Sequence, residues 1–115
     1  MLKSQNRLKS RFEFNVTRKY GEHIKNPFFH LFILKANNYI GPAKIGIVVS
    51  TKVHKNAIKR NRIKRLFIEN LRKQIGKFED NHWIVIQPTQ ECLEKTYEEI
   101  GSEITKTLSK ISGSN

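Results

Sequence analysis

The segment from Lys52 to Arg65 is rich in positive charge and contains no acidic residue. Such a segment suits phosphate, because an Arg guanidinium offers a planar fork of donors and a helix N-terminus adds unpaired N–H groups. The carboxamide of Asn61 both donates and accepts, so contacts to sugars or base edges are also available. The side chains that could bind a phosphate backbone here are Lys52, Lys55, Lys59, Arg60, Asn61, Arg62, Lys64 and Arg65.

This cluster is costly for a chain that binds no anion. Arg62 with Arg65, and Arg60 with Lys64, place like charges three or four positions apart, which repel by about 0.2–0.5 kcal/mol per pair in a helix. Cations at a helix N-terminus also oppose the macrodipole by about 0.3–1 kcal/mol each. The pattern therefore favours a nucleic acid partner over a merely solvated cationic surface.

A helix over about 55–76 must carry this cluster, with Gly76 at its end. On a helical projection the apolar side consists of Ile63, Leu66, Phe67 and Leu71, and the opposite side of Arg62, Arg65, Arg72 and Lys73. Arg60 and Lys64 lie near the apolar side but earlier in the helix. We therefore expect the first turn to project beyond the edge of the core.

Other elements frame that helix. Ser10 and Glu13 have the spacing of a capping box, which predicts a helix over about 11–20 that Gly21 closes. Residues 28–35 and 45–49 are β-rich and are predicted to be a hairpin-like pair of strands, with a third strand at 83–87. Apolar residues at helical spacing from Leu93 to Ile111 predict a last helix. The order is helix, strand, strand, helix, strand, helix, which indicates an α+β layer of helices on one small sheet.

Alternation along the strand 28–35 gives it two different faces. One face would hold Phe28, His30, Phe32 and Leu34, and the other Phe29, Leu31 and Ile33. The second face, together with Ile45, Ile47 and Val49, is expected to be buried. If the first face is exposed, it offers an aromatic platform.

The whole chain has 115 residues, a mass of 13.5 kDa and a formal charge of +12, which fits one domain. Residues 1–77 carry 19 basic and 3 acidic residues, so the charge is polarised. We expect a basic arm at 1–9, ordered on contact with a partner, and a flexible tail at 112–115. No apolar run approaches a membrane span of about 20 residues, and the start has no signal-peptide core. The lone Cys92 and four scattered His predict no disulfide or zinc site, and a cytoplasmic location.

The run from Ala57 to Leu66, Ala-Ile-Lys-Arg-Asn-Arg-Ile-Lys-Arg-Leu, resembles the RNR motif of the bacterial ribonuclease P protein component. The strand from Ile45 to Lys52 resembles the one that precedes this motif. Phe14, with the turn at Gly21, resembles the family's aromatic in the first helix. The strand His82 to Gln87 and the last helix follow in the same order. The resemblance extends from about Leu8 to Ile111.

The resemblance implies a two-layer α+β sandwich with a small mixed sheet and a left-handed βαβ crossover, the fold of the second domain of ribosomal protein S5. It implies an accessory subunit of an endoribonuclease whose RNA subunit, with bound magnesium, removes the 5′ leader of precursor tRNA. No catalytic residue, cofactor or metal ligand is then expected in this chain, and one protein is expected per catalytic RNA. The eight residues of the basic segment would contact that RNA. A second surface, formed by Phe14, Phe32, Phe28, His30, Val48 and Ser50, would bind the single-stranded leader.

Three positions depart from the family pattern. Ile68 stands where another Arg is usual, Arg18 where a second aromatic of the first helix is common, and Thr51 where Lys is frequent. Arg72 could bind RNA in place of the Arg that Ile68 replaces. Phe14 and Phe32 have an alternative interpretation as ordinary core residues.

Other functions also fit parts of the pattern. A ribosomal RNA-binding protein with a structural role would share the charge, size and class. A protein nuclease needs clustered carboxylates or a positioned His base, which this chain lacks in its basic part. A helix-turn-helix regulator needs a second helix across a short turn, and here strands flank the basic helix.

Overall fold

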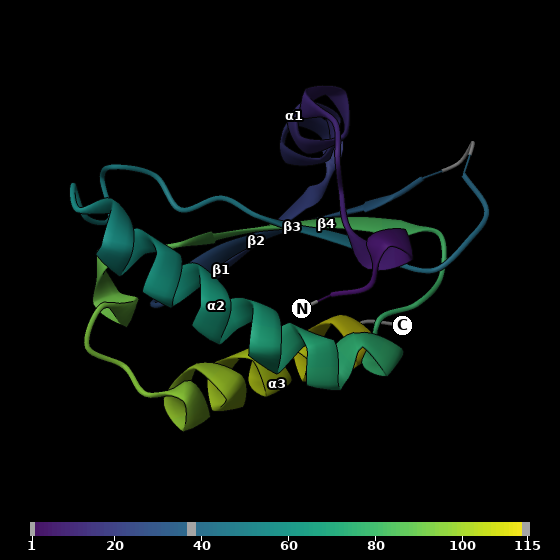
Figure 1. Ribbon diagram of the computed structural model, residues 1–115. Coiled ribbons are helices and arrows are strands. Elements are labelled where there is room, and N and C mark those ends of the chain that lie inside the picture. The colour runs from purple at the N-terminus through teal and green to yellow at the C-terminus, as the bar shows by residue number, and fades with distance from the viewer. Residues whose placement is uncertain (1, 37–38, 114–115) are drawn as a thin grey trace.

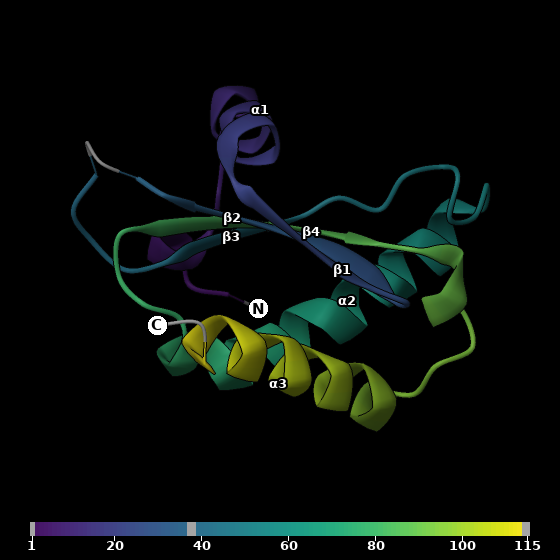
Figure 2. The same cartoon turned by 180° about the vertical axis from the view of Figure 1, so that it is seen from behind.

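Three helices lie on the two faces of one four-stranded sheet (Figure 1). This computed structural model describes residues 2–36 and 39–113. The helices are α1 (Arg11–Tyr20), α2 (Ala57–Gln74) and α3 (Tyr97–Gly113), and the strands are β1 (Glu22–Asn26), β2 (Phe29–Lys35), β3 (Lys44–Ile47) and β4 (His82–Pro88). Short 3-10 turns occupy Ser4–Asn6, Ile75–Lys77 and Gln90–Cys92. Helices α2 and α3 cover one face together, and α1 stands alone on the other (Figures 1 and 2).

The sheet has the strand order β1-β2-β4-β3, and this corrects the predicted pairing. The two strands expected to form a hairpin, β2 and β3, are separated by β4, which is antiparallel to β2 and parallel to β3. The true hairpin joins β1 to β2, and β1 was not predicted because its residues Glu-His-Ile-Lys-Asn are mostly polar. The parallel pair β3 and β4, linked by α2, forms the expected βαβ crossover.

Local signals in the sequence placed α1 correctly. The Ser10 hydroxyl accepts a hydrogen bond from the Glu13 N–H (3.1 Å), and the Glu13 carboxylate accepts one from the Ser10 N–H (2.9 Å), which completes the capping box. Burial alone would raise the pKa of Glu13. Hydrogen bonds from the Ser10 and Lys9 N–H groups and the Lys44 ammonium 3.5 Å away outweigh that effect and lower the pKa.

The main core lies between the sheet and the pair α2 and α3. Its largest fully buried side chains on these elements are Phe29, Leu31, Ile45, Ile84, Ile86, Ile63, Phe67, Leu71, Ile100 and Ile104. The predicted inward face of β2 and apolar side of α2 are thus confirmed. A side chain at Gly101 would collide with buried Asn70, so this glycine permits the close approach of α3 to α2.

The opposite face of the sheet is organised in cross-strand rows. The register places His23, Phe32, Val85 and Gly46 in one row across all four strands. Val85 and Thr17 of α1 are fully buried although neither belongs to the main core, because α1 crosses the sheet over this row. Two neighbouring rows remain uncovered on either side of α1. One contains His30 and Gln87, and the other Leu34 and Trp83.

The basic arm at 1–9 was expected to become ordered on contact with a partner. In the structure, its described residues already pack against the rest of the chain. Leu2 and Leu8 are buried, the Asn6 amide donates to the Ala43 carbonyl (3.0 Å), and the Leu8 N–H donates to the Ile45 carbonyl (3.1 Å). The arm therefore covers part of the outer edge of β3. At the other end α3 extends through Gly113, and the rest of the expected tail, 114–115, lies outside the described residues.

Candidate RNA-binding site

The loop between β3 and α2 fixes the start of the basic segment. Val53 is buried, and its N–H donates to the Ser50 carbonyl (3.1 Å). The Gln90 side chain donates to the Lys52 carbonyl (2.7 Å), which ties this loop to the segment that follows β4. Lys52 is consequently held by its backbone while its side chain remains exposed.

The first turn of α2 is capped by Asn56, a residue that was not among the predicted site residues. Its side-chain oxygen accepts from the N–H groups of Ile58 (2.8 Å) and Lys59 (3.4 Å). The Arg60 guanidinium donates to the His54 carbonyl (2.8 Å) and is partly buried. Arg60 therefore positions the loop in addition to carrying charge.

The remaining predicted RNA-contacting side chains are exposed along α2 and its approach. They are Lys52, Lys55, Lys59, Asn61, Arg62, Lys64 and Arg65. Buried Ile63 orients the helix so that these groups stay outside the core. Arg72 pairs with Glu69 at 3.0 Å, so it does not extend the cationic surface as an unpaired charge. Ile68 is uncharged and packs against the core.

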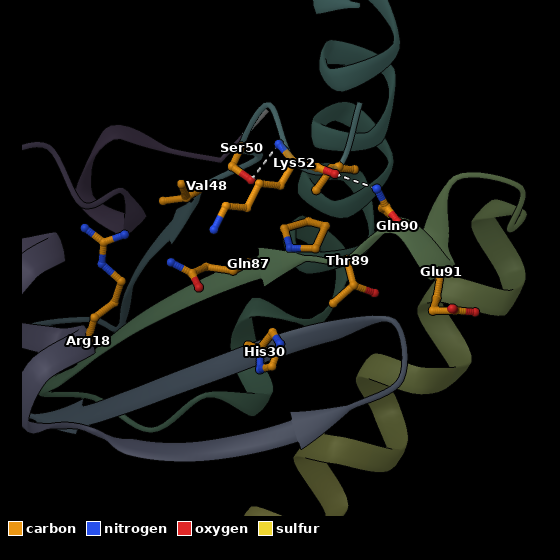
Figure 3. A pocket seen from close by; sticks show the side chains of 11 residues that line it. Arg18, His30, Val48, Ser50, Lys52, Gln87, Thr89, Gln90 and Glu91 are labelled. Atoms are coloured by element: carbon orange, nitrogen blue, oxygen red, sulfur yellow. Dashed lines mark hydrogen bonds between the residues drawn. The ribbon is translucent and has the colours of Figure 1, made fainter. Parts of the chain in front are cut away.

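A groove of about 780 Å³ lies beside α1 over the row that contains His30 and Gln87. We call it the first groove. Figure 3 shows His30 and Gln87 on the strands of its floor, Arg18 on the side of α1, and Val48, Ser50 and Lys52 on the segment after β3. The structure thus brings three predicted leader-binding residues, His30, Val48 and Ser50, to the same groove as the first residue of the basic segment.

The three predicted leader-binding phenylalanines lie elsewhere. Phe14 of α1 sits directly on Gly46 of β3, where any side chain would collide with its ring, and it lines a separate hollow with Lys64. Phe32 is covered by the His23 ring, which stacks on it at 4.4 Å. Phe28 is a correction: it precedes β2 in the hairpin turn, so strand alternation does not apply, and it packs against the core with the Lys95 ammonium 5.1 Å from its ring centre.

A histidine pair lies at the margin of the first groove. The His23 Nε2 and His30 Nδ1 atoms are 2.9 Å apart, so one ring donates to the other. Burial, and then the nearby His30 and Lys25, lower the pKa of His23. This hydrogen bond needs one ring nitrogen that carries no proton, and the lowered pKa of His23 favours its unprotonated form.

Some lining residues of the first groove were missed from the sequence. Gln87 follows inward-facing Ile84 and Ile86 at alternate positions on β4, so strand alternation would have found it. Thr89 and Gln90 follow that strand in an irregular segment with no comparable signal. His23 was missed together with β1.

Within residues 2–36 and 39–113, no three His, Cys, Asp or Glu side chains lie close enough together to hold a metal ion. No helix in this described part of the chain is long and apolar enough to cross a membrane. Cys92 is fully buried, and burial raises the pKa of its thiol to about 11. A thiol with so high a pKa is a poor nucleophile at neutral pH.

The fold and the site together define a basic RNA-binding protein of the α+β class. The sequence profile of the family "Ribonuclease P" matches residues 2–112. A ribonuclease P protein component of Alkaliphilus metalliredigens is 34% identical over 110 residues, which cover 96% of each chain. The component of Clostridium novyi is 29% identical over 109 residues, which cover 95% of this chain and 96% of the other.

Solved structures agree with the sequence relatives. A Staphylococcus aureus RNase P protein mutant superposes with a TM-score of 0.80 at 27% identity, covering 94% of this chain and 88% of the other. The Thermotoga maritima RNase P protein gives 0.78 at 26% identity, covering 90% and 96%. The chain belongs to the ribonuclease P protein family. It is a protein subunit of this endoribonuclease and the partner of its RNA, which confirms the predicted family, fold class and function.

Proposed function

We propose that the first groove holds the single-stranded 5′ leader of precursor tRNA, while the exposed basic side chains of α2 dock on the ribonuclease P RNA. The observation that carries this assignment is the position of Lys52, which lines the first groove and also begins the basic segment. A strand in the first groove would therefore lie next to an RNA bound along α2.

The chemistry of the first groove suits a single strand of varied sequence. Arg18 and Lys52 supply positive charge for the backbone against one carboxylate among the described lining residues, that of Glu91. His30 and Gln87 supply hydrogen-bonding groups on the floor. Such a cationic groove tolerates different bases, because phosphate contacts carry no sequence information. With Phe32 under His23, the exposed His23 ring is the surface that a base could stack on at this margin.

Under this proposal the RNA subunit and its magnesium perform the hydrolysis, and this chain contributes no catalytic group. One protein would bind one catalytic RNA, because among the described helices α2 alone begins with a cluster of exposed basic side chains. The protein would act in the cytoplasm, where precursor tRNA is available.

Reconstituted cleavage tests the proposal. Adding the protein to ribonuclease P RNA at low magnesium should stimulate 5′ processing of precursor tRNA. His30→Ala and Gln87→Ala should lower the preference of the holoenzyme for precursor over mature tRNA. His82→Ala, a histidine at the far end of β4, is the matched control and should leave that preference unchanged.

Equal weakening of precursor and mature tRNA binding by His30→Ala and Gln87→Ala would refute the leader assignment. Absence of any stimulation by the wild-type protein would refute its role in the holoenzyme reaction. Co-sedimentation with ribosomal subunits, together with that absence, would support the ribosomal alternative.

A further inference from the structure

A second groove lies on the other flank of α1, over the row that contains Leu34 and Trp83. Its volume is about 350 Å³. Phe12, Val16 and Tyr20 recur every four residues along α1 and form one wall. The rest of the lining is Leu34, Lys35, Ala36, Tyr39 and Trp83. We call this hollow the second groove.

The walls of the second groove expose aromatic rings to an unusual degree. Phe12 is 68% exposed and Tyr20 is 67% exposed, although most large apolar side chains of the described residues are buried or half-buried. Contiguous exposed apolar surface of this kind marks interaction sites. Trp83 itself is half-buried, and its indole N–H is buried without an acceptor among the described residues.

The charges around these rings identify the chemistry of the occupant. Lys35 lines the second groove, the Lys19 ammonium lies 5.3 Å from the Tyr20 ring centre, and the Lys44 ammonium lies 4.9 Å from that of Tyr39. No carboxylate is among the described residues that line it. Aromatic rings interleaved with ammonium groups suit a single-stranded nucleic acid, whose bases stack and whose phosphates are neutralised. Lys44 already pairs with Glu13 at 3.5 Å, but a purely apolar protein segment would leave the Lys19 and Lys35 ammonium groups without an acidic partner.

We propose that the second groove binds bases of the precursor leader that lie farther from the cleavage site than those in the first groove. This inference rests on the proposed function. Both grooves border the same helix on the same face of the sheet, so a strand leaving the first groove around α1 reaches the second. Long leaders would then gain a contact that short leaders lack.

Trp83 provides a direct reporter, because it is the single tryptophan of the chain. Titration with an unstructured RNA of roughly 16 nucleotides, near the upper site size of single-strand-binding folds, should quench its fluorescence. The quench gives the dissociation constant of the RNA. Phe12→Ala and Tyr20→Ala should each raise this constant by a factor of roughly 5 to 150, the range for stacking on one aromatic ring. Because both side chains are exposed, the folded structure should persist, which circular dichroism verifies.

Tyr97→Ala is the matched control. The Lys73 ammonium lies 5.2 Å from the Tyr97 ring centre, as in the Lys19 and Tyr20 pair, but this pair joins α2 and α3 on the other face of the sheet. This variant should leave the quench unchanged. A wild-type protein whose Trp83 does not respond to the RNA would overturn the proposal.

Leader length separates this inference from the proposed function. Precursors with leaders of roughly 4 and roughly 16 nucleotides, the span of known single-strand site sizes, are bound to the holoenzyme. Tyr20→Ala should weaken only the complex with the longer leader. Equal weakening of both, or of neither, would overturn the second-groove assignment.

The short leader tests the proposed function by itself. If the short-leader precursor binds better than mature tRNA and the longer leader adds nothing, the first groove stands and the second groove fails. If mature tRNA and the short-leader precursor bind alike, the proposed function fails. Concentration-dependent dimerisation that Tyr20→Ala abolishes would assign the second groove to another copy of the chain and overturn RNA binding there.

Discussion

Removal of the Arg62 guanidinium should weaken RNA binding in a way that depends on salt. Arg62 is exposed on α2 and makes no hydrogen bond or ion pair with the described residues, so Arg62→Ala removes charge without breaking the fold. One phosphate contact contributes about 0.7–0.9 to the slope of log affinity against log salt concentration. Between roughly 50 and 200 mM salt, one such contact changes affinity about threefold. The deficit of Arg62→Ala should therefore be about three times larger at the lower concentration.

Filter binding to the ribonuclease P RNA across a salt series measures this slope. Lys106→Ala on α3, where the side chain is 67% exposed and pairs with Glu103, is the control and should keep the wild-type slope. Arg60→Ala should behave differently from both variants, because it also loses the hydrogen bond to the His54 carbonyl and about 1 kcal/mol of folding stability. A deficit of Arg62→Ala that is independent of salt would refute phosphate contact.

Three further predictions concern the elements that position the site. Gly46→Ala should displace the Phe14 ring and cost about 1–3 kcal/mol of unfolding free energy, whereas Gly76→Ala, which has open space around it, should cost less in the same denaturant titration. Glu13→Gln keeps a side-chain oxygen that can accept from the Ser10 N–H, but it removes the negative charge beside the Lys44 ammonium and the start of α1, which should cost about 0.3–1 kcal/mol near neutral pH. Since the pKa of Glu13 is lowered by folding, its contribution is present above the ordinary value of 4.5 and lost as pH falls through the folded value, so the variant should show less acid destabilisation in thermal melts. The pKa of His23 is also lowered by folding, so stability should fall as pH drops through 6.5, and melts of His23→Gln should show a smaller change there.

Much of the fold follows from local signals in the sequence. The capping box at Ser10 and the helical spacing from Ile63 to Leu71 specify α1 and α2, because each signal lies within a few turns of chain. The strand pairing could not be obtained this way. Consecutive β-rich runs suggest a hairpin, but β4, which lies far along the chain, inserts between β2 and β3.

The site was predictable where chemistry is concentrated in one segment. The basic residues at the start of α2 lie within a single short stretch, 59–65, and the structure exposes all of them except Arg60, which is half-buried. The first groove instead draws single residues from α1, β2, the segment after β3, and β4. The failure at Phe28 shows the limit of alternation: a strand begins where its hydrogen bonds begin, and Phe28 lies one residue outside β2.

Helix α1 explains how the aromatic residues of this chain are distributed. The resemblance leads one to expect a second aromatic at the position of Arg18, facing the first groove. The chain has a cation there, and on that side Phe32 is shielded by His23. On the other flank of the same helix, Phe12 and Tyr20 remain open to solvent. The first groove thus offers mainly charge and hydrogen-bonding groups, with the His23 ring at its margin, whereas the second groove holds the exposed rings of α1 beside lysine side chains.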